Sequence, residues 1–320
     1  MSVAENIEAT AELPLDLLRC PVTRAPLDWQ GDALVPHSGN GELRYRIDPS
    51  GIPLFAEQFC SEEARVQEAH YNRVAAAYVA NLGYPHTQEY MAYLDDALLG
   101  VINEASLGTV AEICCGRGEA LQLLGGRIGR GVGVDISPAM LRAAQAENAG
   151  WPFTFVQGDA TMLPLADAAF DSVFMLGGIH HVNDRAGLFG EVARVLKPGG
   201  RFYFREPVSD FLLWQWLRTI VYRLSPALDY DTERPLRHAE TVPPLRDVGL
   251  VCQHWKTHGF LGFCLFMNSD VLVFNRLFRF VPGIRFLTRL WTKIDEWTVR
   301  LPGLHRAGLQ VVGVAERIRG

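Results

Sequence analysis

The sequence predicts an α/β fold built on a doubly wound parallel sheet. Between residues 108 and 207, short apolar runs alternate with amphipathic segments of helical spacing, and glycine-containing turns separate them. Strands that alternate with helices imply parallel pairing, because each crossover helix returns the chain to the same end of the sheet. The chain has 320 residues, 48% of them hydrophobic, which is enough for such a domain and smaller additions.

The first addition is a small β-rich unit. A flexible tail is expected over residues 1–14, and residues 15–58 hold three short apolar runs, LDWQ, ALVP and LRYRI, separated by turn residues. A unit of this size buries little surface by itself, so we expect it to pack on the larger domain, residues 59–320. Two helices should follow, over residues 61–81 with Ser61 as the N-cap, and over residues 87–99 with Gly100 at the end.

The sheet itself is predicted from five successive strands: TVAEICC, GVGVDI, FTFVQGDA, FDSVFML and RFYFREP. The helix after the second strand should begin at Ser137, with Pro138 in its first turn, and the helix through EVARVL should stop at LKPGG. Two late strands, LVCQHWKTHGF and LQVVGVAERI, are interrupted by an insertion over about residues 267–306. An earlier insertion covers about residues 208–238, and both are apolar, aromatic and rich in arginine.

Charge is unevenly distributed along the chain. The formal net charge is −6, so the chain as a whole lacks the basic character of nucleic-acid-binding proteins. From residue 201 onward, however, 17 Lys and Arg face 11 Asp and Glu, a net of +6, which leaves −12 for the first 200 residues. The basic third suits an anionic ligand or a membrane surface.

The cysteines predict neither disulfides nor a metal site. None of the six forms a CxxC pair, and Cys114 and Cys115 are adjacent. The N-terminus has no apolar core of a signal peptide, and no long uncharged apolar stretch predicts a membrane span. We therefore expect a reduced, cytoplasmic protein, peripheral to the membrane at most.

Three motifs end successive strands of the predicted sheet. Gly116 and Gly118 in EICCGRGEA allow a sharp turn close to a ligand, and Asp135 follows 19 residues after Gly116, where an acid can accept hydrogen bonds from ribose hydroxyls. Asp159, in Gly-Asp-Ala, ends the third strand. Ligands of α/β sheets bind at the carboxyl ends of the strands, so together the three motifs indicate a nucleoside site.

The ordered motifs resemble those of the class I methyltransferases that use S-adenosylmethionine (SAM). The resemblance covers residues 105–206 and includes the pattern FDSV…HH…EVARVLKPGG. It implies a Rossmann-like sheet of seven strands with a reversed last strand, and SAM as the cofactor. The loop lacks the GxGxxG spacing of nicotinamide dehydrogenases.

The resemblance also implies which residues hold SAM. Its implied contacts are Glu112 and the backbone of Cys114, Gly116 and Gly118 at the methionine end, Asp135 at the ribose, Ile136, Asp159 and Ala160 at the adenine, and Leu176 near the sulfonium. Many relatives have glycine where this chain has Cys114. Cysteine is small and its backbone can still serve if φ is negative, so we expect the cysteine to be tolerated.

Two further pairs of residues are candidates. His180 and His181 can act as general bases where the acceptor must lose a proton, or one of them can cap a helix or pack beneath the cofactor. Tyr71 and Tyr78 are seven residues apart and share one helical face. That helix either covers SAM, as in relatives, or places both tyrosines in the core.

Residues 17–56 resemble the Trm112-like module, related to zinc ribbons, in CPVTRAPL and the ending YRIDPSGIP. Related modules activate or stabilise methyltransferase partners. Only Cys20 remains of a metal set, so four zinc ligands cannot be assembled and we expect a packing module without metal.

The insertions are predicted to build the acceptor pocket. Their apolar and aromatic walls favour a hydrophobic small molecule such as a lipid, quinone or natural-product intermediate. Their arginines suit anionic groups or lipid heads, or simply lie in solvent on helices that pack together. Two other functions stay open: methylation of nucleic acid, which the acidic charge disfavours, and SAM binding without methyl transfer.

Overall fold

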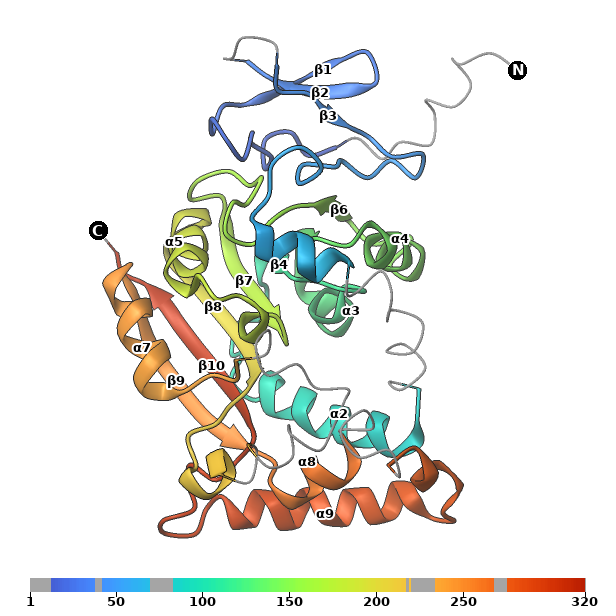
Figure 1. Ribbon diagram of the computed structural model, residues 1–320, viewed down its shortest axis with the longest axis vertical. Helices are drawn as coiled ribbons and strands as arrows, with labels where there is room; N and C mark the ends of the chain where they lie inside the picture. Colours follow the sequence, from blue (N-terminus) through green and yellow to red (C-terminus); the bar gives the residue numbers. More distant parts are fainter. Residues whose placement is uncertain are drawn as a thin grey trace.

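The computed structural model describes residues 13–37, 42–69, 83–216, 219, 234–267 and 275–319. Its main feature is a seven-stranded sheet in the order β6-β5-β4-β7-β8-β10-β9 (Figure 1). The strands of this sheet are β4 (Gly108–Ile113), β5 (Ile128–Asp135), β6 (Phe153–Gln157), β7 (Phe170–Leu176), β8 (Leu196–Pro207), β9 (Leu250–His258) and β10 (Gln310–Arg317). All neighbours among β4 to β8 pair in parallel, and β10 runs antiparallel to both β8 and β9. The predicted sheet with a reversed last strand is confirmed.

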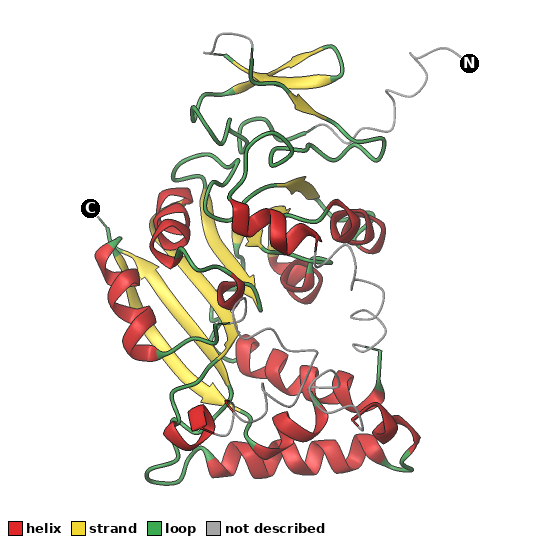
Figure 2. Cartoon of the chain, viewed as in Figure 1, coloured by secondary structure: helices red, strands yellow, loops and turns green. Residues whose placement is uncertain are grey.

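Helices cover both faces of this sheet (Figure 2). They are α2 (Pro85–Leu99), α3 (Glu119–Leu124), α4 (Pro138–Glu147), α5 (Arg185–Val195), α7 (His238–Asp247), α8 (Leu261–Phe266) and α9 (Ile284–Thr298), with 3-10 turns η2 (Gly125–Arg127), η3 (Ile179–His181) and η4 (Asn275–Phe280). Helix α4 begins at Ser137 as predicted, and the Ser137 side chain accepts a hydrogen bond from the Met140 backbone N–H.

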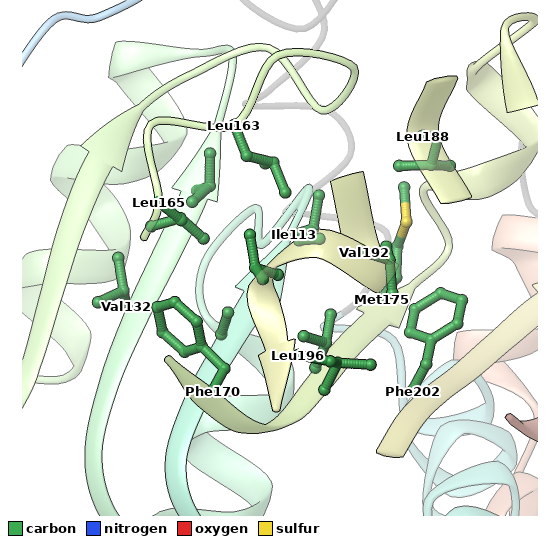
Figure 3. Close-up of a cluster of buried hydrophobic side chains, with 14 of the residues drawn as sticks. Ile113, Val132, Leu163, Leu165, Phe170, Met175, Leu188, Val192, Leu196 and Phe202 are labelled. Carbon is green, nitrogen blue, oxygen red and sulfur yellow. The ribbon is translucent and has the colours of Figure 1, made fainter. Parts of the chain in front are cut away.

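The core has two parts because side chains alternate along each strand. On β8, Phe202 and Phe204 join a cluster with α5, whereas Tyr203 between them joins a cluster with α3 and α4. Figure 3 shows the first cluster, in which Ile113 and Met175 of the sheet lie near Val192 of α5. Strands buried on both faces explain the nearly continuous apolar runs of the sequence.

Two strand boundaries differ from the sequence prediction. Strand β4 ends at Ile113, two residues early, because Cys114 turns the chain with φ of +52°. Strand β8 begins at Leu196 and includes LKPGG, which was expected only to stop a helix. Leu196 pairs with Phe170, and a register shift before the Arg201 pairing accommodates the glycines.

The N-terminal unit is a three-stranded antiparallel sheet of β1 (Leu27–Gln30), β2 (Ala33–Pro36) and β3 (Tyr45–Arg46). It does not have a separate core: Leu18 and Tyr45 belong to the same buried cluster as Leu163 of the large domain. The Arg24 guanidinium also donates to both carboxylate oxygens of Glu191 on α5 at 3.0 and 2.8 Å. The unit is therefore fused to the sheet domain.

The predicted insertions are described in part. Residues 212–216 are helical, and the remainder of the segment up to residue 233, apart from Thr219, lies outside the described residues. Of the second insertion, η4 and α9 are described; α9 packs against α2 and α8 beyond the carboxyl ends of β7 and β8 (Figure 1). Residues 62–69 form the predicted helix after Ser61, but Tyr71 and Tyr78 lie outside the described residues. Of the helices in the described parts of the chain, none combines the length and apolar character that a bilayer-spanning segment needs.

Candidate functional site

A cleft lies where β4, β5, β6 and β7 end. It encloses about 950 Å³, counting its open mouth. Glu112, Cys114, Gly116, Asp135, Ile136, Asp159, Ala160, Leu176 and His181 line it, and all of these are predicted site residues. Gly118 and His180 do not line it. The topology explains the assembly, because parallel strands end at the same edge of the sheet.

The turn after β4 forms the floor of the cleft. Gly116 has φ of +51°, a conformation that favours glycine, and its amide N–H donates to Asp135 Oδ2 at 2.8 Å. Gly118, at φ of +80°, is the N-cap of α3, where an added Cβ would lie 3.0 Å from the Asn148 side chain. Gly118 is thus required where the backbone runs close to the Asn148 side chain, outside the cleft.

Asp135 ties this turn to the start of α4. While Oδ2 accepts from Gly116, Oδ1 accepts from the Ser137 backbone N–H at 2.8 Å. Burial raises the pKa of Asp135, and these backbone donors oppose that shift by favouring the carboxylate. The side chain is therefore fixed at the cleft edge rather than directed away from it.

Asp159 holds the segment that covers the cleft. Its Oδ1 accepts hydrogen bonds from the Thr161 N–H and hydroxyl, and its Oδ2 accepts from the Ser61 N–H at 2.8 Å. Ser61 begins the helix of residues 62–69, whose Glu63 carboxylate accepts from the Asn183 N–H at 2.9 Å. Ser61 and Glu63 themselves line the cleft. The covering helix is therefore attached to the ends of two strands.

Glu112 of β4 is fully buried, and its side chain lies against the first turn of α3. Its two carboxylate oxygens accept from the backbone N–H groups of Ala120 and Leu121 at 2.8 and 3.1 Å. Burial raises its pKa to about 8, although the two backbone donors act in the opposite direction. Glu112 thus satisfies two N–H groups of the first helical turn, which have no partner within the helix.

The cleft is lined by acidic groups, of which Glu112, with a pKa raised to about 8, is largely protonated near neutral pH. Five carboxyl groups line it, from Glu63, Glu112, Glu119, Asp135 and Asp159, and among the described lining residues there is no lysine or arginine. Burial, reinforced by nearby Asp135, Glu206 and Asp159, raises the pKa of the Cys114 thiol far above its usual value. Such a field favours a cation and disfavours the phosphates of a dinucleotide.

Comparisons with known proteins identify the family of this chain. Residues 111–204 match the model of a methyltransferase domain. The chain is 32% identical over 150 residues to the 2-phytyl-1,4-naphtoquinone methyltransferase of Thermosynechococcus vestitus, covering 42% of this chain and 67% of that one. It is 34% identical over 181 residues to the demethylmenaquinone methyltransferase of Tropheryma whipplei, covering 50% and 69%. The chain belongs to the class I SAM-dependent methyltransferases.

Solved structures share the fold of this methyltransferase. The [4+2]-cyclase SpnF has a TM-score of 0.58 at 17% identity, covering 82% of this chain and 98% of that one. A chain of the complex between the Haloferax volcanii Trm112 methyltransferase activator and a methyltransferase has a TM-score of 0.50 at 22% identity, covering 81% and 99%. At these identities the likeness concerns the fold alone.

One residue that organises the loop of residues 177–182, here called the histidine loop, was not among the predicted site residues of the methyltransferase. Glu206 ends β8 and is fully buried; one carboxylate oxygen accepts from the Gly178 and Ile179 N–H groups at 2.7 and 2.8 Å. The other lies 2.8 Å from His180 Nδ1. The sequence feature that could have identified Glu206 as a site residue is its position, because it lies at the carboxyl end of a parallel strand, as Asp135 and Asp159 do. His180 is held by this carboxylate, while His181 reaches the cleft.

The condition set for Cys114, a negative φ, is not met. Cys114 has φ of +52°, and an added Cβ on Gly178 would lie only 2.6 Å from the Cys114 Cβ. A side chain in this conformation costs about 1–2 kcal/mol. The strain lies in the turn that forms the cleft floor.

Cys114→Gly should relieve this strain. We expect a gain of about 0.5–1 kcal/mol in the free energy of unfolding, since the greater flexibility of unfolded glycine offsets part of the relief. Chemical denaturation measures it, with Cys114→Ala as the matched control, because alanine loses the thiol but keeps the strained φ. A glycine variant no more stable than the alanine variant would refute the prediction.

Proposed function

We propose that this enzyme transfers the methyl group of SAM to a hydrophobic or aromatic small molecule in the cleft between the strand ends. The observation that carries the proposal is the acidic lining beside a glycine turn, since SAM is a cationic nucleoside. When bound, SAM supplies an electrophilic methyl group on a sulfonium and leaves as the neutral thioether S-adenosylhomocysteine. The chain then needs chiefly to align the acceptor and exclude water.

The cleft residues suit the parts of this cofactor. The Asp135 carboxylate lies between the Gly116 turn and Ile136, where it can accept from ribose hydroxyls while Ile136 packs on the adenine. Asp159 and Ala160 stand at the adenine edge, although both Asp159 oxygens already accept protein hydrogen bonds. Leu176 and the Cys114 backbone would border the sulfonium and the methionine end. Glu112, whose pKa burial raises to about 8, would act there mainly by holding the first turn of α3.

A hydrophobic acceptor is supported by two observations. The relatives named above methylate isoprenoid quinones, by their names. Apolar side chains of Ile113, Leu176 and Val182 also line the cleft on the side of β7 and the histidine loop. Its acidic lining would repel a nucleic-acid backbone, which disfavours the nucleic-acid alternative.

The decisive experiment is calorimetric titration with SAM, followed by detection of S-adenosylhomocysteine with a demethylated isoprenoid naphthoquinol as acceptor. We expect SAM binding and release of S-adenosylhomocysteine that depends on the acceptor. Absence of SAM binding would overturn the proposal. Binding without transfer to this acceptor or to a panel of hydrophobic phenols would support the SAM-binding alternative instead.

We expect His180 and His181 to have different functions. His181→Ala is expected to lower the transfer rate about 10²-fold with unchanged SAM affinity, because His181 lines the cleft and can accept an acceptor proton. His180→Ala should chiefly loosen the loop held by Glu206. The pH profile of transfer checks the assignment: an unaltered profile in His181→Ala would exclude it as a base.

We also propose that residues 15–58 are a Trm112-like module built into the chain, where it stabilises the methyltransferase domain without metal. The pairing of Arg24 with Glu191 and the shared apolar cluster support this role. Cys20 Sγ lies 3.0 Å from the Tyr45 hydroxyl, so its environment is that of a packed thiol. Elemental analysis should find no stoichiometric zinc; a full equivalent would contradict the proposal.

A further inference from the structure

Helix α9 carries buried polar groups on the side that faces the protein. Thr288, Thr292 and Asp295 are buried, and the Tyr90 hydroxyl of α2 donates to Asp295 Oδ2 at 2.9 Å. A surface helix of a globular protein ordinarily does the opposite, with its apolar stripe turned to the core. Ile284 and Trp291 also pack on this side, in the cluster of Tyr90 and Leu94, but the other large apolar side chains of α9 do not.

Five apolar side chains of α9 lie on the outer face. Four of them follow one another at spacings of four, four and three residues: Phe286, Leu290, Ile294 and Trp297. These four fall within about 80° around the helix axis, and Leu287 extends this sector to about 100°. All five are exposed, Phe286 to 69% and Trp297 to 63% of their surface. The sector points about 150° away from Thr288 and Asp295.

The segment before α9 extends this surface. Leu277 and Phe280 of η4 are exposed, as is Val281, whose N–H donates to the Phe278 carbonyl and whose carbonyl accepts from Ile284. We call the exposed apolar side chains of η4 and α9, with Val281, the α9 face. Figure 1 places α9 along the lower edge of the molecule, opposite the N-terminal unit.

The exposed charges that η4 and α9 themselves contribute have one sign, although Glu89 of α2 pairs with two of them, Arg285 and Arg289. The exposed charged residues of the described segment 276–306 are all basic: Arg276, Arg279, Arg285, Arg289, Lys293, Arg300 and Arg306. Its two acids turn inward, Asp295 to Tyr90 and Glu296 to Tyr93 and Lys256. On α9, Arg289 and Lys293 border the apolar sector on the side of Phe286.

We propose that the α9 face docks onto an anionic lipid bilayer, with α9 lying in the plane of the membrane surface. An interfacial helix combines an apolar face containing Trp, Phe and Leu with Lys and Arg beside it, and anionic lipids attract the latter. A second copy of the chain fits less well, because it would bring basic residues against basic residues.

The orientation of the sheet gives this docking a consequence. The carboxyl ends of β7 and β8 point toward the layer of α2, α8 and α9 (Figure 1), so the membrane would lie on the side of the sheet where the cleft forms. An acceptor that partitions into lipid would then be delivered near the cleft. The docking itself requires no methyl transfer and is tested separately.

The test is flotation of the full chain with vesicles of phosphatidylcholine alone or mixed with phosphatidylglycerol. We expect binding to the mixed vesicles, weaker by about tenfold on the neutral ones and reduced by salt. The double variant Phe286→Gln/Trp297→Gln should lose binding by about tenfold or more. Trp29→Gln is the matched control, because Trp29 is 48% exposed on β1 at the other end of the molecule.

Three results would overturn the proposal: no binding of the wild-type chain to mixed vesicles, equal binding by the double variant, or a dimer in analytical ultracentrifugation that the double variant abolishes without any vesicle binding. Arg276→Gln/Lys293→Gln should lose the preference for anionic vesicles. Calorimetric SAM affinity of the double variant should equal that of the wild type, so a failure here is distinguishable from a failure of the proposed function.

Discussion

Asp135→Ala is expected to weaken SAM binding by about 10²-fold or more, because two charge-assisted hydrogen bonds to the ribose are worth about 1.5–3 kcal/mol each. The carboxylate is fixed by the Gly116 and Ser137 N–H groups, so no neighbouring side chain can replace it. Isothermal titration calorimetry with SAM measures the effect. Asp135→Asn should retain part of the affinity, since one acceptor oxygen remains.

The matched control is Asp171→Ala. Asp171 also accepts a backbone N–H, from Thr109 at 2.9 Å, but it lies at the amino end of β7, away from the cleft. Its loss should cost stability and leave SAM affinity unchanged. Wild-type SAM affinity in Asp135→Ala, or an equal loss in both variants, would contradict the proposed role of Asp135.

Glu206→Ala is expected to lower the free energy of unfolding by about 2–5 kcal/mol, because it leaves the buried N–H groups of Gly178 and Ile179 without their acceptor. The loop that presents His181 would lose its anchor, so methyl transfer should fall by about 10²-fold or more. Chemical denaturation and single-turnover kinetics measure the two effects.

Glu57→Gln provides the control for Glu206. Glu57 pairs with Arg46 on the surface of the N-terminal unit, and its replacement should change stability by less than about 0.5 kcal/mol. Glu206→Gln keeps the volume but presents an amide NH₂ to donors, so it should be nearly as damaging as alanine. A Glu206→Gln enzyme with normal stability and turnover would show that the loop does not depend on this carboxylate.

The sheet was predictable because its signals are local. Apolar runs and turn glycines fix each strand, and the order of strands follows from the crossover helices, so Asp135 and Asp159 could be placed at one edge without coordinates. The site was less predictable in its contacts. The hydrogen bond from the Ser61 N–H to Asp159 joins residues that lie 98 positions apart in the chain, so no local sequence pattern predicts it.

Cys114 and α9 show two further limits of sequence reasoning. Cys114 has a positive φ and lies close to Gly178, which follows a different strand, and no local sequence pattern predicts either feature. The apolar stripe of α9 was predicted to wall a pocket, as apolar helical stripes usually do. Five of its apolar side chains are exposed instead, while Asp295 and Glu296 accept hydrogen bonds from Tyr90 and Tyr93 of α2.

The shared apolar cluster beneath the N-terminal unit has a consequence for how the chain melts. Leu18 and Tyr45 belong to the same buried cluster as Leu163 and Phe170. Unfolding of either part would therefore expose apolar side chains of the other to water. Calorimetry should accordingly record one cooperative heat-absorption peak, with no separate early transition for the described part of the N-terminal unit. A protease that removed this unit would leave behind a domain prone to aggregation.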